Sequence, residues 1–188
     1  MIVLIADAFS ILFLVVVILW FLVPMIYGRP SIPTRPERVR KALKLANLQS
    51  NEVLYDLGAG DGRGLFIAAR EFGARAVGIE AGPIQFAWIL LRLVAGGLRN
   101  QIQVRWANFS RVDLHEADVV FFHATSREVA RLAPRLEQQL KKGARVVSIS
   151  ADLPEWEPSA FDSQNLVFVY EMPPTEGNLT SYMLKKAK

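Results

Sequence analysis

The chain contains no cysteine and only two histidines. The absence of cysteine excludes disulfide bonds, thiolate metal sites and a cysteine nucleophile, and it fits a reducing compartment. Neither histidine belongs to a His/Asp/Glu spacing that would bind a metal, so we expect no metal ion. No Ser/His/Asp order and no paired-carboxylate arrangement stands out. These absences exclude several enzyme classes without identifying one.

The chain carries only a small excess of positive over negative charge. The formal net charge of +4 over 188 residues does not indicate a nucleic-acid partner. Much of the positive charge follows an apolar segment near the N-terminus, where it favours a membrane surface that carries anionic lipid. These residues are Arg29, Arg35, Arg38, Arg40, Lys41 and Lys44, with a second group at Lys185, Lys186 and Lys188.

The apolar segment runs from Ala8 to Tyr27 and is interrupted by Ser10. Its length is close to the ~20 residues that a helix needs to cross a hydrocarbon core. Arginines follow the segment and none precedes it, which predicts the N-terminus outside and the rest of the chain in the cytosol. We therefore expect a transmembrane anchor at residues 1–28, a soluble domain at residues 29–188, and a single-pass membrane protein with the lipid bilayer as a partner. A cleaved signal peptide and a buried or interfacial helix are the alternatives.

The first helix of the domain is expected after a short connector at residues 28–33. Thr34 is followed three residues later by Glu37, which is the spacing of a capping box. Apolar residues then recur on one face until about Leu48, as in a helix that packs on the domain. We therefore predict that Thr34 caps this helix.

A glycine-rich loop joins two short apolar strands through a helix. Residues 52–57 form the first strand, residues 58–64 carry alternate glycines, and helical spacing follows up to Gly73. The second strand ends at Glu80. This order is the opening unit of a parallel, doubly wound sheet.

The glycine loop predicts a nucleoside-binding site. Glycines let the backbone approach a ligand, the helix start attracts an anion, and Glu80 can accept two hydrogen bonds from a ribose diol. Asp56 enters the loop beside the expected ligand, and a carboxylate there suits an ammonium group better than a pyrophosphate. We therefore favour S-adenosylmethionine as the cofactor over a dinucleotide, with a tight turn that binds nothing as the remaining alternative.

At these residues the sequence resembles the class I S-adenosylmethionine-dependent methyltransferases. It is most similar to the membrane-associated protein-lysine methyltransferases that modify the ATP-synthase c-subunit and the ADP/ATP carrier, and to their prokaryotic relatives. The resemblance covers about residues 31–172. It rests on Pro33-Thr-Arg-Pro36, Tyr55-Asp-Leu-Gly-Ala-Gly-Asp-Gly-Arg63, Gly78-Ile-Glu80 and Leu153-Pro-Glu-Trp-Glu-Pro158.

The resemblance implies roles for the residues around the loop. The methionine end of the cofactor would lie against Asp56, Gly58, Ala59, Gly60 and Gly62. Glu80 would hold the ribose hydroxyls, and Ala81 would lie beside the adenosine. The superfamily usually has an acidic residue after the third strand; here Asn108 stands there, and its amide oxygen can still accept from the adenine amino group. Phe109 would cover the adenine ring.

The rest of the chain completes the fold that the resemblance implies. Further strands are expected at residues 101–107, 118–122 and 144–150, a helix at 128–141, and a final antiparallel pair at 165–172 and 180–185. The predicted fold class is therefore α/β. We expect a Rossmann-like doubly wound sheet of seven strands whose last pair is antiparallel, preceded by a single N-terminal transmembrane helix.

The end of the fourth strand faces the transferable methyl group in this superfamily. His123 and Thr125, with Ser126, are therefore candidates to line the substrate entrance. A histidine hydrogen-bonded to a loop carbonyl is the alternative for His123. Trp156 either contacts the substrate or packs within its own loop. The sequence identifies no general base.

The favoured function is methylation of a lysine side chain on a membrane-associated protein, with S-adenosylmethionine as the donor. Confinement to a bilayer would raise the effective concentration of the enzyme near such substrates. The alternatives are methylation of a lipid or other small molecule, and a non-catalytic membrane scaffold that retains the fold. The intact glycine loop together with Glu80 disfavours the scaffold, and the alternate glycines disfavour a nicotinamide-dependent reductase.

Overall fold

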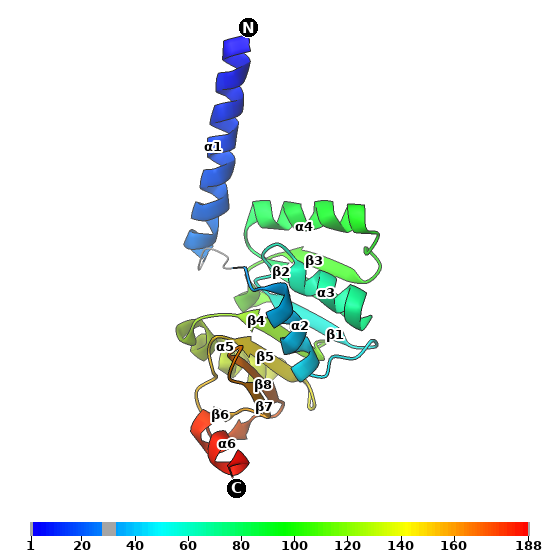
Figure 1. Cartoon of the computed structure of the whole chain (residues 1–188), viewed down its shortest axis with the longest axis vertical. Helices are drawn as coiled ribbons and strands as arrows, with labels where there is room; N and C mark the ends of the chain where they lie inside the picture. Colours follow the sequence, from blue (N-terminus) through cyan, green and yellow to red (C-terminus); the bar gives the residue numbers. More distant parts are fainter. Residues whose placement is uncertain (1, 28–32, 188) are drawn as a thin grey trace.

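The structure is a computed structural model that describes residues 2–27 and 33–187, and within its first helix the side chains of residues 5–18. The predicted connector falls mainly on residues 28–32, which lie outside the described residues. The first helix, α1 (Ile2–Tyr27), extends away from the rest of the molecule and contacts α4 (Pro83–Gly96) (Figure 1). The other elements form a central sheet with helices on both faces.

Seven strands form the central sheet, in the order β3-β2-β1-β4-β5-β8-β7. The first five of these strands pair in parallel, whereas β8 is antiparallel to both β5 and β7. The strands are β1 (Val53–Leu57), β2 (Arg75–Glu80), β3 (Ile102–Trp106), β4 (Val119–His123), β5 (Arg145–Ile149), β7 (Ala160–Asp162) and β8 (Val167–Glu171). The predicted Rossmann-like α/β fold, with seven strands and an antiparallel last pair, is confirmed.

Helices cover the two faces of the sheet. The face that carries α4 also carries α2 (Pro36–Leu45) and α3 (Arg63–Phe72), and α5 (Ser126–Gln139) covers the other face. β1 serves both faces: Leu54 packs toward α2 and α3, while Tyr55 packs toward α5. This follows from the alternation of side chains along a strand. With both faces covered, the carboxyl ends of the parallel strands are the open edge of the sheet.

The predicted strand at residues 180–185 is wrong, because this segment forms the helix α6 (Leu179–Lys186). Asn178 precedes the helix, and its side chain accepts a hydrogen bond from the backbone N–H of Ser181 at 2.9 Å. Such a side-chain cap favours the start of a helix. The antiparallel partner of β8 is instead β7, and β6 (Trp156–Glu157) pairs with β9 (Thr175–Glu176) in a separate two-stranded sheet.

The predicted capping box at Thr34 is also wrong. α2 begins at Pro36, and its N-cap residue, Arg35, makes no side-chain cap. A capping box occurs instead at the start of α5, where Glu128 accepts a hydrogen bond from the backbone N–H of Thr125 at 2.8 Å. The Thr34 hydroxyl makes a long-range contact with β4, which a local pattern cannot reveal.

The prediction of a single-pass membrane protein needs correction. In the part of the chain that the structure describes, no helix is both long and apolar enough to cross a membrane. A spanning helix needs ~20 consecutive apolar residues. The predicted placement of the domain on the cytosolic face of a bilayer loses its basis with the span.

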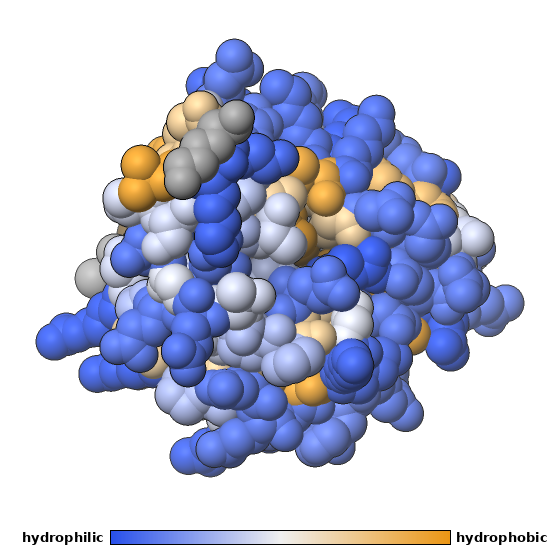
Figure 2. All heavy atoms as spheres, turned by 90° about the horizontal axis from the view of Figure 1, so that it is seen from below, coloured by the Kyte–Doolittle hydropathy of each residue, from blue (hydrophilic) through white to orange (hydrophobic). Residues whose placement is uncertain are grey.

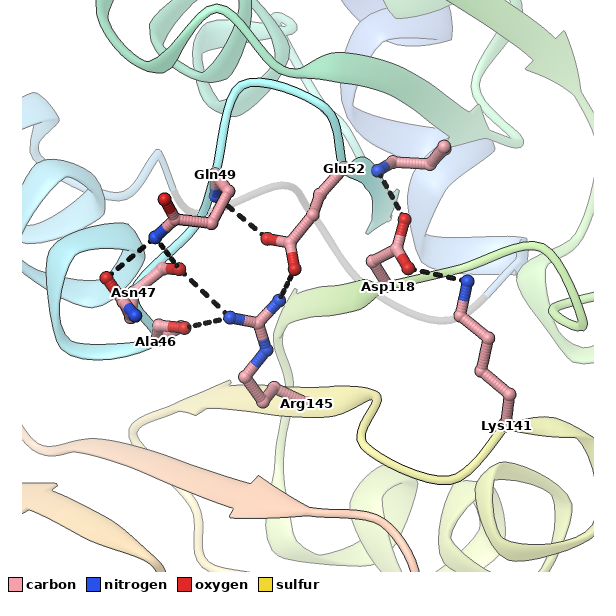
Figure 3. Close-up of polar contacts among 8 residues, drawn as sticks. Ala46, Asn47, Gln49, Glu52, Asp118, Lys141 and Arg145 are labelled. Carbon is pink, nitrogen blue, oxygen red and sulfur yellow. Dashed lines mark hydrogen bonds and ion pairs between the residues drawn. The ribbon is translucent and has the colours of Figure 1, made fainter.

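Ion pairs join the amino ends of β1, β4 and β5, at the sheet edge opposite the open one (Figure 3). Arg145 donates to two backbone carbonyl oxygens just after α2, at 2.7 and 2.9 Å, and forms a salt bridge with Glu52. Asp118 accepts from the N–H of Val53 at 2.8 Å and pairs with Lys141 at 2.5 Å. This polar cluster holds the beginnings of three strands in register.

Candidate active site

A cavity of about 680 Å³ opens at the carboxyl ends of the parallel strands. Its wall combines the glycine loop after β1 with the segments that follow the neighbouring strands, so residues far apart in the sequence meet there. The predicted residues that line it are Asp56, Gly58, Ala59, Gly60, Glu80, Ala81, Asn108, Phe109, His123 and Thr125. Gly62 lies behind this wall, where a Cβ atom would be 3.1 Å from the Ile89 side chain.

The glycine loop turns sharply between β1 and α3. Gly58 and Gly60 have φ angles of 86° and 59°, a left-handed conformation that favours glycine. The N–H groups of Gly58 and Ala59 donate to the carbonyl oxygen of Ile79 at 2.9 and 3.0 Å, which ties the loop to β2. A Cβ atom at Gly58 would meet nothing within 4 Å. The backbone at this point is therefore open to a ligand in the cavity.

Glu80 is buried at the carboxyl end of β2 and faces the glycine loop. One carboxylate oxygen accepts from the N–H of Gly60 and the other from the N–H of Gly82, both at 2.7 Å. Burial raises the pKa of Glu80, against the opposing effect of these backbone hydrogen bonds. Because each carboxylate oxygen has two lone pairs, Glu80 keeps acceptor capacity for a ligand hydroxyl.

Asp56 lies deeper in the wall, with 4% of its surface exposed. Burial raises the pKa of Asp56 to about 8, with smaller contributions from the negative charges of Glu80 and Asp61. The carboxyl group is therefore largely protonated at neutral pH when no cation lies beside it. A ligand with an ammonium group would favour the ionised form, because opposite charges attract.

Asn108 follows β3 at the adenine side of the predicted site. Its Oδ1 atom accepts from the backbone N–H of Ser110 at 2.9 Å and from the Ser110 hydroxyl at 2.8 Å. Both lone pairs of the amide oxygen are thus used within the loop, and the amide N–H₂ is the group left for a ligand. Adenine recognition by the Asn108 oxygen stays a prediction, and it would require Ser110 to release one of these bonds.

His123 ends β4 and hydrogen-bonds to two hydroxyl groups. Its Nδ1 atom lies 2.9 Å from Thr34 Oγ1, and its Nε2 atom lies 3.0 Å from Ser150 Oγ. Both hydroxyl residues also line the cavity. Thr125 serves mainly as the N-cap of α5, because its hydroxyl and its N–H both donate to Glu128. His123 is therefore better placed than Thr125 to act on a bound substrate.

Comparisons with known proteins identify the family. The sequence model of the ANTKMT methyltransferase domain matches residues 56–160, more than half of the chain. The chain belongs to this family. A protein-lysine N-methyltransferase of Saccharolobus islandicus (strain REY15A) is 35% identical over 130 residues, which are 69% of this chain and 81% of the relative. A Mus musculus lysine N-methyltransferase named for the ATP-synthase c-subunit is 25% identical over 150 residues, which are 79% of this chain and 60% of the relative.

A solved structure supports the same assignment. It is an RNA methyltransferase from Salinibacter ruber in complex with S-adenosyl-L-homocysteine, with a TM-score of 0.74 and 33% sequence identity. The match covers 78% of this chain and 97% of the other. This member of the ANTKMT methyltransferase family is therefore an S-adenosylmethionine-dependent methyltransferase, as the glycine loop predicted.

The cavity of this methyltransferase suits its cofactor. Glu80 can accept a hydrogen bond from a ribose hydroxyl, Asp56 can pair with an ammonium group, and Gly58 leaves the backbone open. When bound, S-adenosylmethionine supplies an electrophilic methyl group. Within the described residues, no group of three or more His, Cys, Asp or Glu is arranged to hold a metal ion.

Two arginines to which the sequence assigned no role bind Asp61 of the glycine loop in this methyltransferase. Arg63 forms a salt bridge with Asp61 at 2.6 Å and donates to the carbonyl oxygen of Thr34 at 2.7 Å. Burial would raise the pKa of Asp61, but the hydrogen bonds from Arg63 outweigh it and the pKa is lowered. Arg92 donates to the Asp61 carbonyl oxygen at 2.5 Å and lies 4.3 Å above the ring of Phe66. The sequence shows Asp61 and Arg63 two residues apart, but it does not reveal their contacts with α4 and with the segment before α2.

Two tryptophans have structural roles near the cavity-forming segments or away from the cavity. Trp156 is 7% exposed, packs edge-on against Tyr170 at 5.8 Å between ring centroids, and does not line the cavity, so it packs within the domain rather than against substrate. Trp106, which the sequence did not single out, donates from Nε1 to the Ala81 carbonyl oxygen at 2.9 Å. It thereby holds the segment that follows Glu80.

Proposed function

We propose that this methyltransferase transfers its methyl group to a lysine side chain of a protein. The observation that carries the proposal is the set of hydroxyl and imidazole groups formed by Thr34, His123 and Ser150 in the cavity wall. Such groups accept hydrogen bonds from an amine. Arg63 links Thr34 to the glycine loop, on the side where the methionine end of the cofactor is expected. The 35% identity with a protein-lysine N-methyltransferase supports the same acceptor.

A narrower proposal is that the lysine belongs to a membrane-associated protein. Relatives named for the ATP-synthase c-subunit and for adenine nucleotide translocase are 25% and 28% identical to this chain. The outer side of α4 adds physical support, because Trp88, Leu91 and Val94 are 46%, 60% and 57% exposed and Trp88 also lines the cavity. The face of the molecule in Figure 2 is largely hydrophilic by contrast, with apolar groups only in small patches. The apolar side of α4 would suit an apolar segment beside the target lysine.

RNA is the second candidate acceptor. The observation in its favour is the 33% identity with the Salinibacter ruber protein named an RNA methyltransferase. The modest net charge of +4 argues against it, because binding of a phosphate backbone depends on clustered lysine and arginine. A protein acceptor therefore remains the proposal.

The proposed catalytic unit is the predicted domain at residues 29–188. The central sheet with the helix α2 lies within residues 36–171, and the residues that line the cavity lie within residues 33–151. The test nevertheless uses the full chain, so that α1 is present.

Transfer of a tritiated methyl group would test the acceptor class. The purified chain is incubated with labelled S-adenosylmethionine and a cell extract, which is then separated into protein, RNA and lipid. We expect label in the protein fraction and, after acid hydrolysis, in methylated lysine. Label in RNA or in lipid, with unlabelled protein, would replace the proposal by the corresponding alternative.

A further inference from the structure

Four side chains from separate parts of the fold form a continuous hydrogen-bonded chain at the cavity. Thr34 Oγ1 lies 2.9 Å from His123 Nδ1, His123 Nε2 lies 3.0 Å from Ser150 Oγ, and Arg38 Nη2 donates to Ser150 Oγ at 2.9 Å. Three of the four line the cavity, and Arg38 stands behind them on α2. Thr34 is the member on the side of the glycine loop, because Arg63 binds its carbonyl oxygen.

Ser150, at one end of this series of hydrogen bonds, is held in place by several contacts. Arg38 also donates from Nε to the carbonyl oxygen of Asn165 at 2.5 Å, which fixes the guanidinium against the turn before β8. Ser150 has a φ of 73°, a left-handed conformation that is unfavourable for a residue with a side chain, and its N–H donates to Leu166 at 2.9 Å. Backbone strain of this kind clusters at functional sites. The strained turn places the serine hydroxyl between Arg38 and His123.

Arg38 fixes one role of Ser150, because the guanidinium donates to its hydroxyl oxygen. A guanidinium only donates, so Ser150 Oγ accepts from it. Ser150 can then either donate its own proton to His123 Nε2 or use its second lone pair to accept a proton carried on Nε2, and deprotonation of a substrate through Thr34 requires the second arrangement. In that tautomer the Nδ1 atom of His123 is an acceptor, and the Thr34 hydroxyl donates to it. The oxygen of Thr34 then has free lone pairs for a hydrogen of the incoming substrate.

We propose that Thr34 and His123 form a proton relay that deprotonates the substrate lysine, and that Ser150 and Arg38 position the imidazole. This inference rests on the proposed lysine methylation. An ammonium proton passes to Thr34 Oγ1 while the hydroxyl proton of Thr34 passes to His123 Nδ1. The products are a neutral amine, an unchanged threonine and an imidazolium held by Ser150. The amine lone pair then attacks the methyl group, and the imidazolium returns its proton to solvent.

Other charged groups near the relay can also contribute to the pH dependence of the rate. Asp61 and Arg63 face Thr34 as an ion pair from the glycine loop, and Arg38 approaches from α2. Asp56 from β1 and Glu128 from α5 also line the cavity. Measurements at saturating cofactor, and comparison of variants that leave these five groups in place, separate the relay from their titration.

Thr34→Val tests the relay because it removes the hydroxyl and keeps the shape. The full chain is assayed for methyllysine formation in the protein fraction across pH 6 to 9, and cofactor binding is measured by calorimetry. General base catalysis typically contributes 10²–10⁴-fold, so we expect a loss of roughly 10²-fold or more at pH 7 with unchanged cofactor affinity. The wild-type rate should depend less steeply on pH than the variant rate, because the variant can use only the amine that is already free in solution. Thr34→Ser should restore most of the rate, and Thr180→Val on exposed α6 is the matched control.

His123→Asn provides an independent second test. If both residues serve one relay, the double variant with Thr34→Val should be no slower than the slower of the two single variants, because effects within one unit are not additive. A Thr34→Val enzyme with wild-type rate and pH profile, or additive losses in the double variant, would overturn the relay alone. A wild-type chain that forms no methyllysine would overturn the proposed function and the relay with it.

Discussion

At the scale of single residues, two buried carboxyl groups in the cavity wall differ in their surroundings. Glu80 binds two backbone N–H groups and keeps acceptor sites, whereas Asp56 has no such backbone donors and remains largely protonated at neutral pH. Their environments therefore suit different ends of S-adenosylmethionine. Glu80 suits neutral hydroxyls and Asp56 suits a cation.

Glu80→Gln should weaken cofactor binding by roughly 10- to 100-fold. The amide keeps the shape but replaces one acceptor oxygen by a donor, which would face the N–H of either Gly60 or Gly82, and hydrogen bonds to charged groups contribute about 1.5–3 kcal/mol. Calorimetric titration of S-adenosylmethionine measures the change. Glu116→Gln, at an exposed position, is the control. An unchanged dissociation constant would remove Glu80 from the site.

Asp56→Asn should make cofactor affinity weaker and nearly independent of pH. In the wild-type chain the pKa of Asp56 is about 8 in place of 3.8, so binding of a cation beside it releases a proton below that pH. Affinity should therefore rise as the pH increases toward about 8 and then level off. Calorimetry in two buffers of different ionisation enthalpy counts the released protons. Equal proton release by both chains would contradict this role.

The same carboxyl group also links stability to pH. The folded chain keeps a proton on Asp56 that the unfolded chain loses above its ordinary pKa, so stability of the ligand-free protein falls as pH rises between about 4 and 8. Asp56→Asn should remove this part of the loss. Urea unfolding at pH 5 and pH 8 compares the two chains.

At the scale of secondary-structure elements, the first turn of α3 is packed directly against β1. A Cβ atom at Gly64 would lie 2.4 Å from Asp56 Oδ2, on a carboxyl group that is itself buried. The close approach of this helix to the strand is what brings the helix start to the cavity. A glycine is therefore required at this position for packing, although it lies inside a helix.

Gly64→Ala should destabilise the protein by about 1–3 kcal/mol and weaken cofactor binding, because the added methyl group displaces Asp56. In an exposed helix the same change would stabilise by up to ~1 kcal/mol. Gly96→Ala is the matched control, since its Cβ would meet the flexible end of Arg70 at 2.9 Å and the Phe66 ring at an ordinary contact distance of 3.9 Å. Urea unfolding measures both chains. Equal stability changes would show that α3 tolerates the methyl group.

At the scale of the whole molecule, the two edges of the sheet have separate tasks. The carboxyl edge carries the cavity, and the amino edge carries the polar cluster around Arg145 and Glu52 (Figure 3). Arg145 also binds the backbone after α2, so it joins β5, β1 and α2 at one point. Stability and catalysis should therefore respond to different substitutions.

Arg145→Met should lower the free energy of unfolding by about 2 kcal/mol, because it removes charge-assisted bonds from a pair whose side chains are 17% and 20% exposed. The melting temperature should fall by roughly 4–8 °C, with kcat unchanged well below it. Lys141→Met is the control, since its more exposed ion pair with Asp118 should contribute about 1 kcal/mol or less. Thermal unfolding and initial rates test both chains. A large loss of kcat in Arg145→Met would contradict the separation of the two edges.

The sequence by itself determined the strands from β1 to β5 and the residues of the glycine loop, although the helix α4 between β2 and β3 was not predicted. Alternate glycines, apolar strands and the position of Glu80 are local patterns, and each reflects a local requirement of backbone geometry. They sufficed for the fold class and for the cofactor. Segments with weak local signals were not determined in this way: residues 180–185 formed a capped helix, and the short strand β7 went unpredicted.

Only the tertiary structure decided what Thr34, His123 and Ser150 do. The local pattern around Thr34 indicated a helix cap, but its hydroxyl contacts a histidine 89 positions later in the chain. Packing of α2 against β5 and β8 brings the segment before α2 to the end of β4, and no local spacing encodes it. A hydrogen bond between distant residues depends on how whole elements dock, which is why the cofactor loop was readable from the sequence and the proposed proton relay was not.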